Sequence, residues 1–500
     1  MRKLSFHWNG SASQDGLITA RAKKAVVFLV VCAVAAIASP AQTFTSLHSF
    51  NFRDGGTPLA GLVQGTDGNF YGTTNVGGAG NNCFGACGTV FKITPKGALT
   101  TLYNFCTLVD CNDGASPKAG LVQGTDGNFY GTTTAGGTGK FCTDGCGTVF
   151  KITPEGELTT LHSFNGTDGI FPEAGLVQDT EGNFYGTTIF GGTSNNCDGG
   201  CGTVFKITPQ GELTTLHSFN GTDGDTPLAV LVQGTDGNFY GTTSDDDGTG
   251  KSGTVFKITP KGKLTTLHNF NGTDGRTPRA GLALGADGNF YGTTLFGGIG
   301  NNNCTFGCGT VFKITLKGKL TTLHRFNGAD GDGPQAVLTQ DTDGNFYGTT
   351  VNGGANLGTV FKITPEGKLT TLHNFCTQTN CPDGALPQVG VVQGTDGSFY
   401  GTAPVDGTRR HGTVFRLSVG LGQFVETRPT SGKVGAKVSI LGTNLTGATG
   451  ISFNGTAATF DVVSKSEITT TVPAGATTGT IEVTTPKQTL KSNMVFRVTK

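Results

Sequence analysis

Gly68-Asn69-Phe70-Tyr71-Gly72-Thr73-Thr74 is the stretch that decides the fold, because the chain repeats it seven times. Six copies are identical, and the seventh reads Gly-Ser-Phe-Tyr-Gly-Thr-Ala. The copies begin at Gly68, Gly127, Gly182, Gly237, Gly288, Gly344 and Gly397, so neighbouring copies start 51–59 residues apart. A period of this length, built from strand-forming residues, is typical of propellers and stacked arrays.

Each repeat contains four short runs with the composition of β-strands. In the first repeat these runs are Ala60–Gln64, Asn69–Thr74, Gly88–Thr94 and Leu99–Phe105. Thr, Val, Phe, Tyr and Ile fit a pleated, half-buried surface, and the Gly, Asp, Asn and Pro residues between the runs form turns. Runs one and two, and runs three and four, are joined by tight Asp-Gly and Pro-Lys-Gly turns. Each repeat is therefore predicted to be a four-stranded antiparallel meander, and the fold class is all-β.

The repeat is out of phase with the ends of the chain. The fourth run occurs first, alone, at 44–50, and the seventh repeat ends with its third run at 412–418. Pairing of these two segments would close a ring and remove an exposed sheet edge. Stacked arrays also need atypical end repeats, which are missing from this sequence. We therefore predict a seven-bladed β-propeller over residues 42–418, closed by an N-terminal strand, with run one nearest the axis and run four outermost.

The repeat resembles a known family. Gly61-Leu62-Val63 followed by Asp67–Thr74, together with the later copies, is similar to the GloVer tandem repeat of bacterial surface and secreted proteins over roughly residues 44–418. This resemblance implies an exported repeat protein and brings no established activity with it.

The first 41 residues have the pattern of a secretory signal peptide. Arg21, Lys23 and Lys24 precede an apolar run at 25–38, and small residues follow it, which predicts cleavage after Ala41. The run is too short for a stable membrane span; an uncleaved anchor is the alternative. Removing residues 1–41 takes five basic residues and one acidic residue from the 35 of each, which leaves a net charge of −4. No basic face for nucleic acid is indicated. We expect a secreted, extracellular or cell-surface monomer.

The remaining twelve cysteines form close pairs. An even number, close spacing and an export signal favour disulfides, and zinc bound by two pairs is the alternative. The predicted pairs are Cys83 with Cys87, Cys106 with Cys111, Cys142 with Cys146, Cys197 with Cys201, Cys304 with Cys308, and Cys376 with Cys381. All twelve fall in the long connections, which share one face of the predicted disc. Function usually lies on variable loops of a rigid scaffold, whereas neutral drift of tolerant loops is the alternative.

The same predicted face carries aromatic residues that could stack on sugar rings or grip a protein, although loop packing explains each one singly. These ligand-face candidates are Phe84, Phe141, Phe171, Phe190, Phe296 and Phe306. Glu173 and Asp332 are acidic residues that interrupt the repeat pattern. They are the residues to examine for glycan chemistry at the mouth of the central channel.

Two further patterns suggest metal binding, and each has a simpler interpretation. Histidines recur in the fourth run, at His48, His162, His217, His268, His324 and His373. Equivalent positions in a ring lie one blade apart, so they predict packing or hydrogen bonding and no shared ion. Asp245-Asp246-Asp247 and the pair Asp341 and Asp343 resemble fragments of calcium loops. Solvated loops are favoured for both, and we expect no cofactor.

Residues 427–500 follow a linker at 419–426 and form a separate domain in sequence. Pro429–Gly432, Val438–Leu445, Phe453–Gly455 and Val472–Ala476 resemble the IPT/TIG domain, which implies an immunoglobulin-like β-sandwich that acts as a spacer or interaction module. The chain ends without a hydrophobic tail, which suggests release or attachment through a partner.

These observations predict a secreted, non-catalytic binding or scaffold protein. Its ligand would be an extracellular polysaccharide or an envelope protein. No nucleophile elbow, zinc-protease motif or phosphate loop occurs, so enzyme activity is not indicated. Two alternatives stay open: an extracellular glycan hydrolase or lyase, and a structural adhesin.

Overall fold

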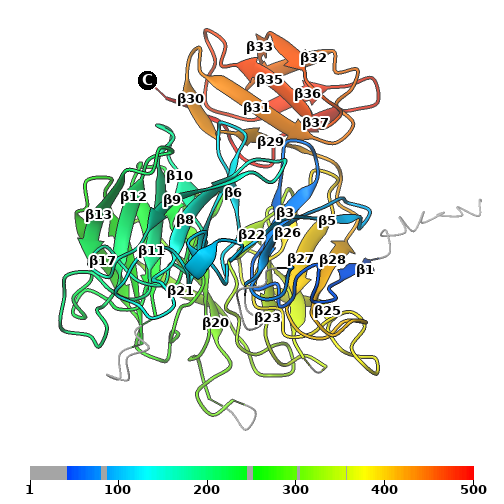
Figure 1. The fold of residues 1–500 in the computed structure, drawn as a ribbon. Coiled ribbons are helices and arrows are strands. Elements are labelled where there is room, and N and C mark those ends of the chain that lie inside the picture. The colour runs from blue at the N-terminus through cyan, green and yellow to red at the C-terminus, as the bar shows by residue number, and fades with distance from the viewer. Residues whose placement is uncertain (1–41, 80–86, 245–251, 301–303, 356, 500) are drawn as a thin grey trace, which may run out of the picture. The chain divides into compact units, whose positions relative to one another are not determined.

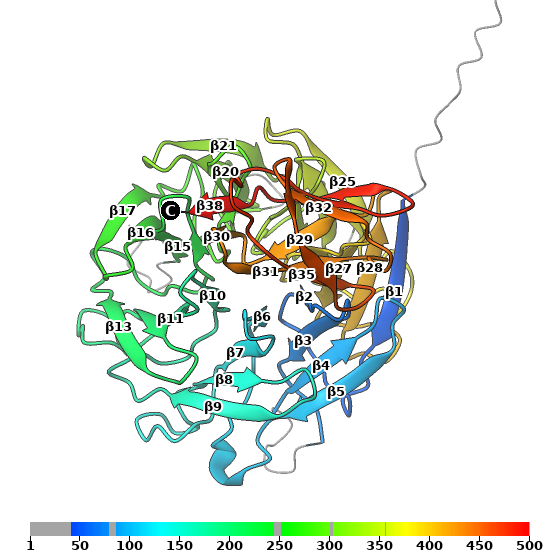
Figure 2. The same cartoon turned by 90° about the horizontal axis from the view of Figure 1, so that it is seen from above.

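The computed structural model describes residues 42–79, 87–244, 252–300, 304–355 and 357–499. Within these ranges a four-stranded antiparallel sheet recurs seven times, and each sheet is one blade of a propeller. Figure 2 shows the blades around a central axis, with β2, β6 and β10 near the centre and β5, β9 and β13 at the rim. The predicted propeller and the predicted order of runs within each blade are thus confirmed.

The strands are equivalent from blade to blade. The innermost strands are β2 (Val63–Gln64), β6 (Val122–Gln123), β10 (Val177–Gln178), β14 (Val232–Gln233), β18 (Ala283–Leu284), β22 (Thr339–Gln340) and β26 (Val392–Gln393). The second strands are β3 (Phe70–Thr74), β7 (Phe129–Thr133), β11 (Phe184–Thr188), β15 (Phe239–Thr243), β19 (Phe290–Thr294), β23 (Phe346–Thr350) and β27 (Phe399–Ala403).

The outer half of each blade follows the same scheme. The third strands are β4 (Thr89–Ile93), β8 (Thr148–Ile152), β12 (Thr203–Ile207), β16 (Thr254–Ile258), β20 (Thr310–Ile314), β24 (Thr359–Ile363) and β28 (Thr413–Ser418). The outermost strands are β5 (Leu99–Asn104), β9 (Leu158–Ser163), β13 (Leu213–Ser218), β17 (Leu264–Asn269), β21 (Leu320–Arg325), β25 (Leu369–Asn374) and β1 (Thr43–Ser49). One 3-10 turn, η1 (Val109–Cys111), lies between the first two blades.

The Phe-Tyr-Gly-Thr-Thr motif is the buried second strand, covered on both sides. In β3 all five residues are buried, because the neighbouring blades cover both faces of the sheet. A Cβ atom on Gly72 would lie 2.8 Å from the side chains of Leu62 and Phe91, so only glycine fits between the strands. The central glycine of the motif is therefore a packing requirement, whereas Gly68 in the preceding turn is required by its positive φ of 80°.

Two sets of contacts hold each blade to the next. The motif tyrosine stacks on the motif phenylalanine of the following blade, as in Tyr71 on Phe129, whose ring centroids are 4.0 Å apart. The first motif threonine donates a hydrogen bond to a carbonyl in the next innermost segment, as from Thr73 Oγ1 to the oxygen of Ala119 at 3.0 Å. Stacked aromatic pairs add about 0.5–1.5 kcal/mol each beyond the area that they bury.

The ring closes between the last blade and the first. Strand β1 pairs antiparallel with β28, from Thr43 opposite Ser418 to Ser49 opposite Thr413. At the junction between the seventh blade and the first, Tyr400 stacks on Phe70 at 3.9 Å, and Thr402 Oγ1 donates to the oxygen of Ala60 at 3.0 Å. The closing seam therefore has the same contacts as the other blade junctions, which confirms closure by the N-terminal strand.

The C-terminal residues form the predicted β-sandwich, seen in orange and red in Figure 1. One sheet has the order β29-β31-β35-β34, the other β33-β32-β36-β37, and β30 and β38 form a parallel pair. The bounds are β29 (Val425–Arg428), β30 (Ser431–Lys433), β31 (Lys437–Gly442), β32 (Gly450–Phe453), β33 (Thr456–Ala458), β34 (Phe460–Val462), β35 (Glu467–Thr471), β36 (Ile481–Thr484), β37 (Thr489–Lys491) and β38 (Arg497–Thr499). Ile440, Phe453, Ile468 and Phe496 belong to its core.

Within the compact unit from Pro40 to Lys500, hydrogen bonds join this domain to turns of the propeller. Ser466 Oγ donates to the carbonyl oxygen of Thr66 at 2.9 Å, and an Arg428 NH group donates to Gln123 Oε1 at 2.8 Å. A membrane-spanning helix is absent from the part of the chain that the structure describes.

Candidate functional site

The propeller has two unlike ends. Because neighbouring strands are antiparallel, successive connections alternate between the ends. The tight-turn face carries the turns between innermost and second strands and between third and outermost strands. The long-connection face carries the connections from second to third strands and from one blade to the next. Among the described propeller residues, all large apolar side chains that are exposed lie on the long-connection face: Phe52, Leu108, Phe141, Phe296, Ile299, Phe306 and Val405.

A repeated Tyr–Asp contact fixes the tight-turn face. Tyr71 donates its hydroxyl hydrogen to Asp67 Oδ2 at 2.8 Å, and Tyr130 does the same to Asp126 at 2.7 Å. Burial and the neighbouring carboxylate raise the pKa of Tyr71 above its ordinary value. All seven motif tyrosines in the described chain make this bond, so the turn aspartates have a structural role. The other pairs are Tyr185 with Asp179, Tyr240 with Asp236, Tyr291 with Asp287, Tyr347 with Asp343, and Tyr400 with Asp396.

A second repeated contact, here called the latch, ties the outermost strand of each blade to the connection that follows it on the long-connection face. In each latch, a histidine on the outermost strand bonds through Nε2 to Oδ2 of an aspartate six or ten residues later, at 2.9–3.0 Å. The latches are His48 with Asp54, His162 with Asp168, His217 with Asp223, His268 with Asp274, His324 with Asp330, and His373 with Asp383. In the remaining blade Tyr103 replaces the histidine and donates to Asp113. The predicted hydrogen-bonding role of the histidines is confirmed.

Two of the latch aspartates, Asp223 and Asp330, have a lowered pKa. Burial works to raise the pKa of Asp223, but hydrogen bonds from His217 and from the backbone N–H of Asn220 outweigh it, and the pKa lies below its ordinary value. Asp330 behaves in the same way beside His324. Burial lowers the pKa of His48, against the opposing pull of Asp54. These two latches therefore depend on an ionised aspartate, and acid should weaken them.

Disulfides staple the long connections. Those in the described ranges are Cys106–Cys111, Cys142–Cys146, Cys197–Cys201, Cys304–Cys308 and Cys376–Cys381, each as predicted from spacing. Cys83 lies outside the described residues, and Cys87 is disulfide-bonded. Cysteines paired in this way do not supply the four thiolates that the alternative zinc site needs.

A cavity of about 510 Å³ follows the propeller axis and is lined by the innermost segments of the blades. Its walls are small residues such as Ala60, Gly61, Ala119 and Gly120, whose size keeps the backbones close to the axis. At its mouth on the long-connection face, the residue after the repeated proline of each innermost segment differs between blades. These mouth residues are Leu59, Lys118, Glu173, Leu228, Arg279, Gln335 and Gln388.

Three of the seven mouth residues are charged. Lys118 Nζ forms an ion pair with Glu173 Oε1 across two neighbouring blades, and both side chains are partly exposed. Arg279 is exposed two blades further on. Each of these three charged side chains stands where other blades have Leu or Gln, so it is not needed for the packing that all blades share. The charged residues therefore mark the part of the cavity that is suited to polar interactions with a ligand.

A side groove of about 580 Å³ leads from this mouth to the stapled loop of the third blade. It shares Glu173, Leu228 and Arg279 with the axial cavity. Its other lining residues are Ile189, Phe190, Asn196, Cys197, Asp198, Asp225 and Thr226. An apolar floor with several convergent hydrogen-bonding groups is the usual composition of a site for a small polar ligand.

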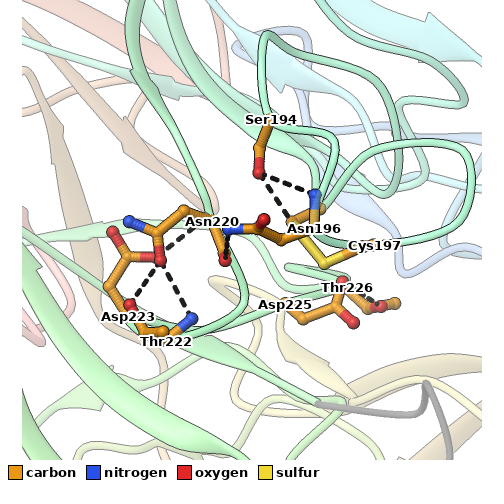
Figure 3. The surroundings of a disulfide bond; sticks show 9 residues. Ser194, Asn196, Cys197, Asn220, Thr222, Asp223, Asp225 and Thr226 are labelled. Atoms are coloured by element: carbon orange, nitrogen blue, oxygen red, sulfur yellow. Dashed lines mark hydrogen bonds between the residues drawn. A yellow bond between two sulfur atoms is a disulfide. The ribbon is translucent and has the colours of Figure 1, made fainter.

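Figure 3 shows how the groove wall is held in place. Asn196 Nδ2 donates to the carbonyl oxygen of Asn220 at 3.0 Å, which ties the stapled loop to the next connection. Asn220 in turn donates its backbone N–H to Asp223 Oδ1, the other oxygen of a latch carboxylate. Thr226 Oγ1 donates to Asp225 Oδ1 at 2.9 Å. The groove wall is thus connected to the latch and the disulfide.

The predicted ligand-face aromatics separate into two groups. Phe141 and Phe306 are 71% and 70% exposed, and Phe296 is 37% exposed. Phe171 and Phe190 are partly buried against the core of the third blade, with their rings in an edge contact at 6.3 Å. Of the five, Phe190 lines the side groove. Phe84 lies outside the described residues, as do Asp245, Asp246 and Asp247.

The prediction that Asp341 and Asp343 lie in a solvated loop is wrong for Asp341. Asp341 occupies the turn position that is Gly65 in the first blade, is only 4% exposed, and accepts a hydrogen bond from the backbone N–H of Asp343 at 2.7 Å. Burial, and next the neighbouring Asp343, raise the pKa of Asp341 to about 8, so it is protonated at neutral pH. Asp332, also noted from sequence, is partly buried, and burial raises its pKa.

Sequence reasoning found Glu173 but missed Lys118 and Arg279. The signal was present: all three follow the repeated proline, and this position carries Leu or Gln in the other four blades. Asp225 was missed as well, although it stands two residues before that proline, at the position of Asp332, which was noted from the sequence.

Comparison with known proteins agrees with the repeat structure. The Gloeobacter/Verrucomicrobia repeat matches residues 33–198, 88–306 and 283–461. The chain belongs to the Gloeobacter/Verrucomicrobia repeat family. An IPT/TIG domain matches residues 425–498 of this repeat protein. No curated protein matches the chain.

Solved structures share the architecture only distantly with this repeat protein. They include the extracellular domain of a hybrid two-component system from B. thetaiotaomicron, at 12% identity and a TM-score of 0.48, covering 90% of this chain and 57% of that one. A fungal alcohol oxidase in complex with copper matches at 13% identity and a TM-score of 0.48, and the match covers 92% of this chain and 99% of that one. A gluconolactonase from Xanthomonas campestris matches at 13% identity and a TM-score of 0.36, and the match covers 54% of this chain and 78% of that one. Similarity at this level transfers no activity.

Proposed function

We propose that this repeat protein is a secreted, non-catalytic binding protein that holds a neutral carbohydrate on its long-connection face. The binding site is the mouth of the axial cavity together with the side groove. One observation carries the proposal: the side chains that depart from the seven-fold pattern converge at this mouth. Lys118, Glu173 and Arg279 lie there, and the groove adds Phe190.

The chemistry of the groove suits a sugar. Carboxylates and a guanidinium group present paired acceptors and donors that match neighbouring hydroxyls. The apolar floor of Ile189, Phe190 and Leu228 suits the C–H face of a pyranose ring. The three carboxylates of the groove, Glu173, Asp198 and Asp225, outnumber its one cation, Arg279, which favours an uncharged polysaccharide over an acidic one. A volume of about 580 Å³ is within the usual range for small-ligand sites.

Export is part of the proposal. Disulfides in several blades are typical of oxidising compartments, and the signal-like segment at 1–41 would direct the chain there. On the opposite face, turns of the propeller are hydrogen-bonded to the C-terminal domain, as Thr66 is to Ser466. That domain would serve as spacer or docking module and leave the long-connection face to the ligand.

The test is a pull-down of residues 42–500 against immobilised neutral and acidic polysaccharides, with and without calcium, followed by an assay for released sugar. We expect retention on a neutral polysaccharide without release and without calcium dependence. The variants Arg279→Gln and Glu173→Gln should each weaken binding about 10-fold or more, the effect of losing one good hydrogen bond to a charged group. Lys261→Ala, an exposed residue in a tight turn, is the matched control.

Other outcomes separate the alternatives. Released sugar would place the protein among glycan-active enzymes. Retention that does not change in Arg279→Gln and Glu173→Gln would overturn the assignment of this site. Absence of binding to the whole panel would overturn the carbohydrate ligand and leave a protein partner, for which exposed Phe141 and Phe306 are the residues to test next.

A further inference from the structure

Two blades carry the same cysteine and carboxylate pattern. Cys197, Cys201 and Asp225 are spaced identically to Cys304, Cys308 and Asp332: three residues separate the cysteines, and the aspartate lies 24 residues after the second one. In both blades the aspartate opens the next blade and faces the stapled loop of the preceding blade.

The three side chains of each group converge. In both groups the two sulfur atoms and one carboxylate oxygen lie within 4.8 Å of one another. Cys201 and Cys308 are fully buried, and Asp225 is 2% exposed. Figure 3 shows Asp225 beside Cys197, with Thr226 bonded to one of its oxygens. Asp225 is buried and Asp332 is partly buried, so both differ from the fully solvent-facing acids of a surface loop.

The second blade shows that the disulfide does not require the aspartate. Cys142 and Cys146 have the same spacing and form a disulfide, yet the residue 24 positions after Cys146 is Ile170. Ile170 is 5% exposed and packs in the core of that blade beside Cys146. The aspartates of the other two groups therefore replace an apolar side chain that suits a disulfide at least as well.

We propose that these two loops become zinc-class cation sites when their disulfides are reduced. A dithiol reductant transfers two electrons and two protons to each disulfide and is itself oxidised to a disulfide, which leaves two cysteine thiols. A divalent cation then displaces both thiol protons and binds two thiolates and the aspartate. The fourth tetrahedral position takes water. This inference does not depend on the proposed carbohydrate function.

The groups have what such an ion requires. Two cysteines two to four residues apart, completed by a more distant ligand, are typical of zinc sites. The Cα atoms of the cysteine pairs are 5.2 and 5.3 Å apart, close enough for both sulfurs to reach one ion. The hydrogen bond from Thr226 Oγ1 to Asp225 Oδ1 would orient the carboxylate, as outer partners of metal ligands commonly do.

The experiment uses Co²⁺ as a spectroscopic probe on residues 42–500, reduced with a phosphine and kept anaerobic. We expect thiolate-to-cobalt charge-transfer absorption that saturates at two ions per chain, and competition by Zn²⁺. Asp225→Asn and Asp332→Asn should each weaken one site by at least about 10-fold, since even outer partners of ligands contribute that much. The oxidised protein should show no such absorption.

The second blade supplies the control. The double variant Cys142→Ser and Cys146→Ser should leave the stoichiometry at two. Equal loss of cobalt binding in this variant, or no effect of the two Asp→Asn substitutions, would overturn the proposal. A reduced chain that unfolds would bind through its cysteines alone, independently of Asp225, and would count against it in the same way. Near-ultraviolet circular dichroism of each variant distinguishes unfolding from ligand loss.

Discussion

The two faces of the propeller are built from the same repeat and differ in what each residue contacts. On the tight-turn face Tyr71 is stacked on the next blade and bonded to Asp67 in its own turn. A change there disturbs a blade and its junction together, which explains why the pair recurs seven times. On the long-connection face the latch recurs, whereas the length and the disulfide content of the loops beyond it differ between blades.

The latch explains how that freedom is possible. His217 reaches an aspartate six residues later, whereas His373 reaches one ten residues later, across an insertion that contains Cys376 and Cys381. Both bonds are 2.9 Å long. The insertion therefore lengthens the loop while the hydrogen bond between the outermost strand and the connection stays the same. A repeat protein can vary one face in this way while its ring stays closed.

The largest effect is expected from opening the ring. Deleting residues 42–49 removes β1, exposes the edge of β28, and removes the stacking of Phe44 on His373 at 3.7 Å. We expect the free energy of unfolding to fall by about 5 kcal/mol or more, which is beyond the usual range of single substitutions. Urea unfolding measures it, and adding the peptide 42–50 in trans should restore part of the stability. An unchanged melting temperature would contradict closure by this strand.

The next largest effect on stability is expected from the tight turn that contains Asp341, which differs from the equivalent turns of other blades. The raised pKa of Asp341, about 8, means that this residue keeps its proton in the folded state while the unfolded chain ionises near pH 4. Stability should therefore be fully present below about pH 4 and fall as pH rises toward 8, by up to ~1.4 kcal/mol per pH unit. Asp341→Asn should remove this slope and stabilise the protein at pH 7.

Unfolding of both proteins in urea at pH 5, 6 and 7 tests the prediction. The partner Asp343 has a lowered pKa and titrates below this window, so it does not contribute to the difference. Identical pH dependence of the variant and the natural protein would show that Asp341 is ionised in the fold.

Most of the fold could be predicted from the sequence, because its information is repeated. The motif fixed the number of blades, and the lone fourth run at 44–50 indicated closure. Burial of Asp341 could not be predicted, since the turn signature is the same whether the carboxyl points outward or beneath the turn. The convergence of Lys118, Glu173 and Arg279 needs the ring itself, because these residues come from three blades and meet only around the axis.

Removing one disulfide from the long-connection face should lower stability less than opening the ring. The pair Cys142→Ser and Cys146→Ser opens a very small covalent loop, for which the chain-entropy relation gives about 2 kcal/mol. We expect that loss of stability in urea with the blade contacts intact, and the far-ultraviolet circular dichroism spectrum should not change. A loss as large as that of the β1 deletion would show that the loop supports the ring.

The smallest effect should come from a single latch. His217→Ala removes one hydrogen bond from Asp223, whose backbone contacts with Asn220 remain, so we expect a loss of about 1 kcal/mol at pH 7. The lowered pKa of Asp223 makes this stabilisation present above about pH 4 and lost as pH falls through the folded value. The variant and the natural protein should therefore converge in stability as pH falls through the lowered pKa of Asp223. His217→Gln, which keeps a donor, is the matched control. A stability deficit that persists once Asp223 is protonated would mean that the imidazole acts by packing against Phe219, its edge contact at 5.0 Å.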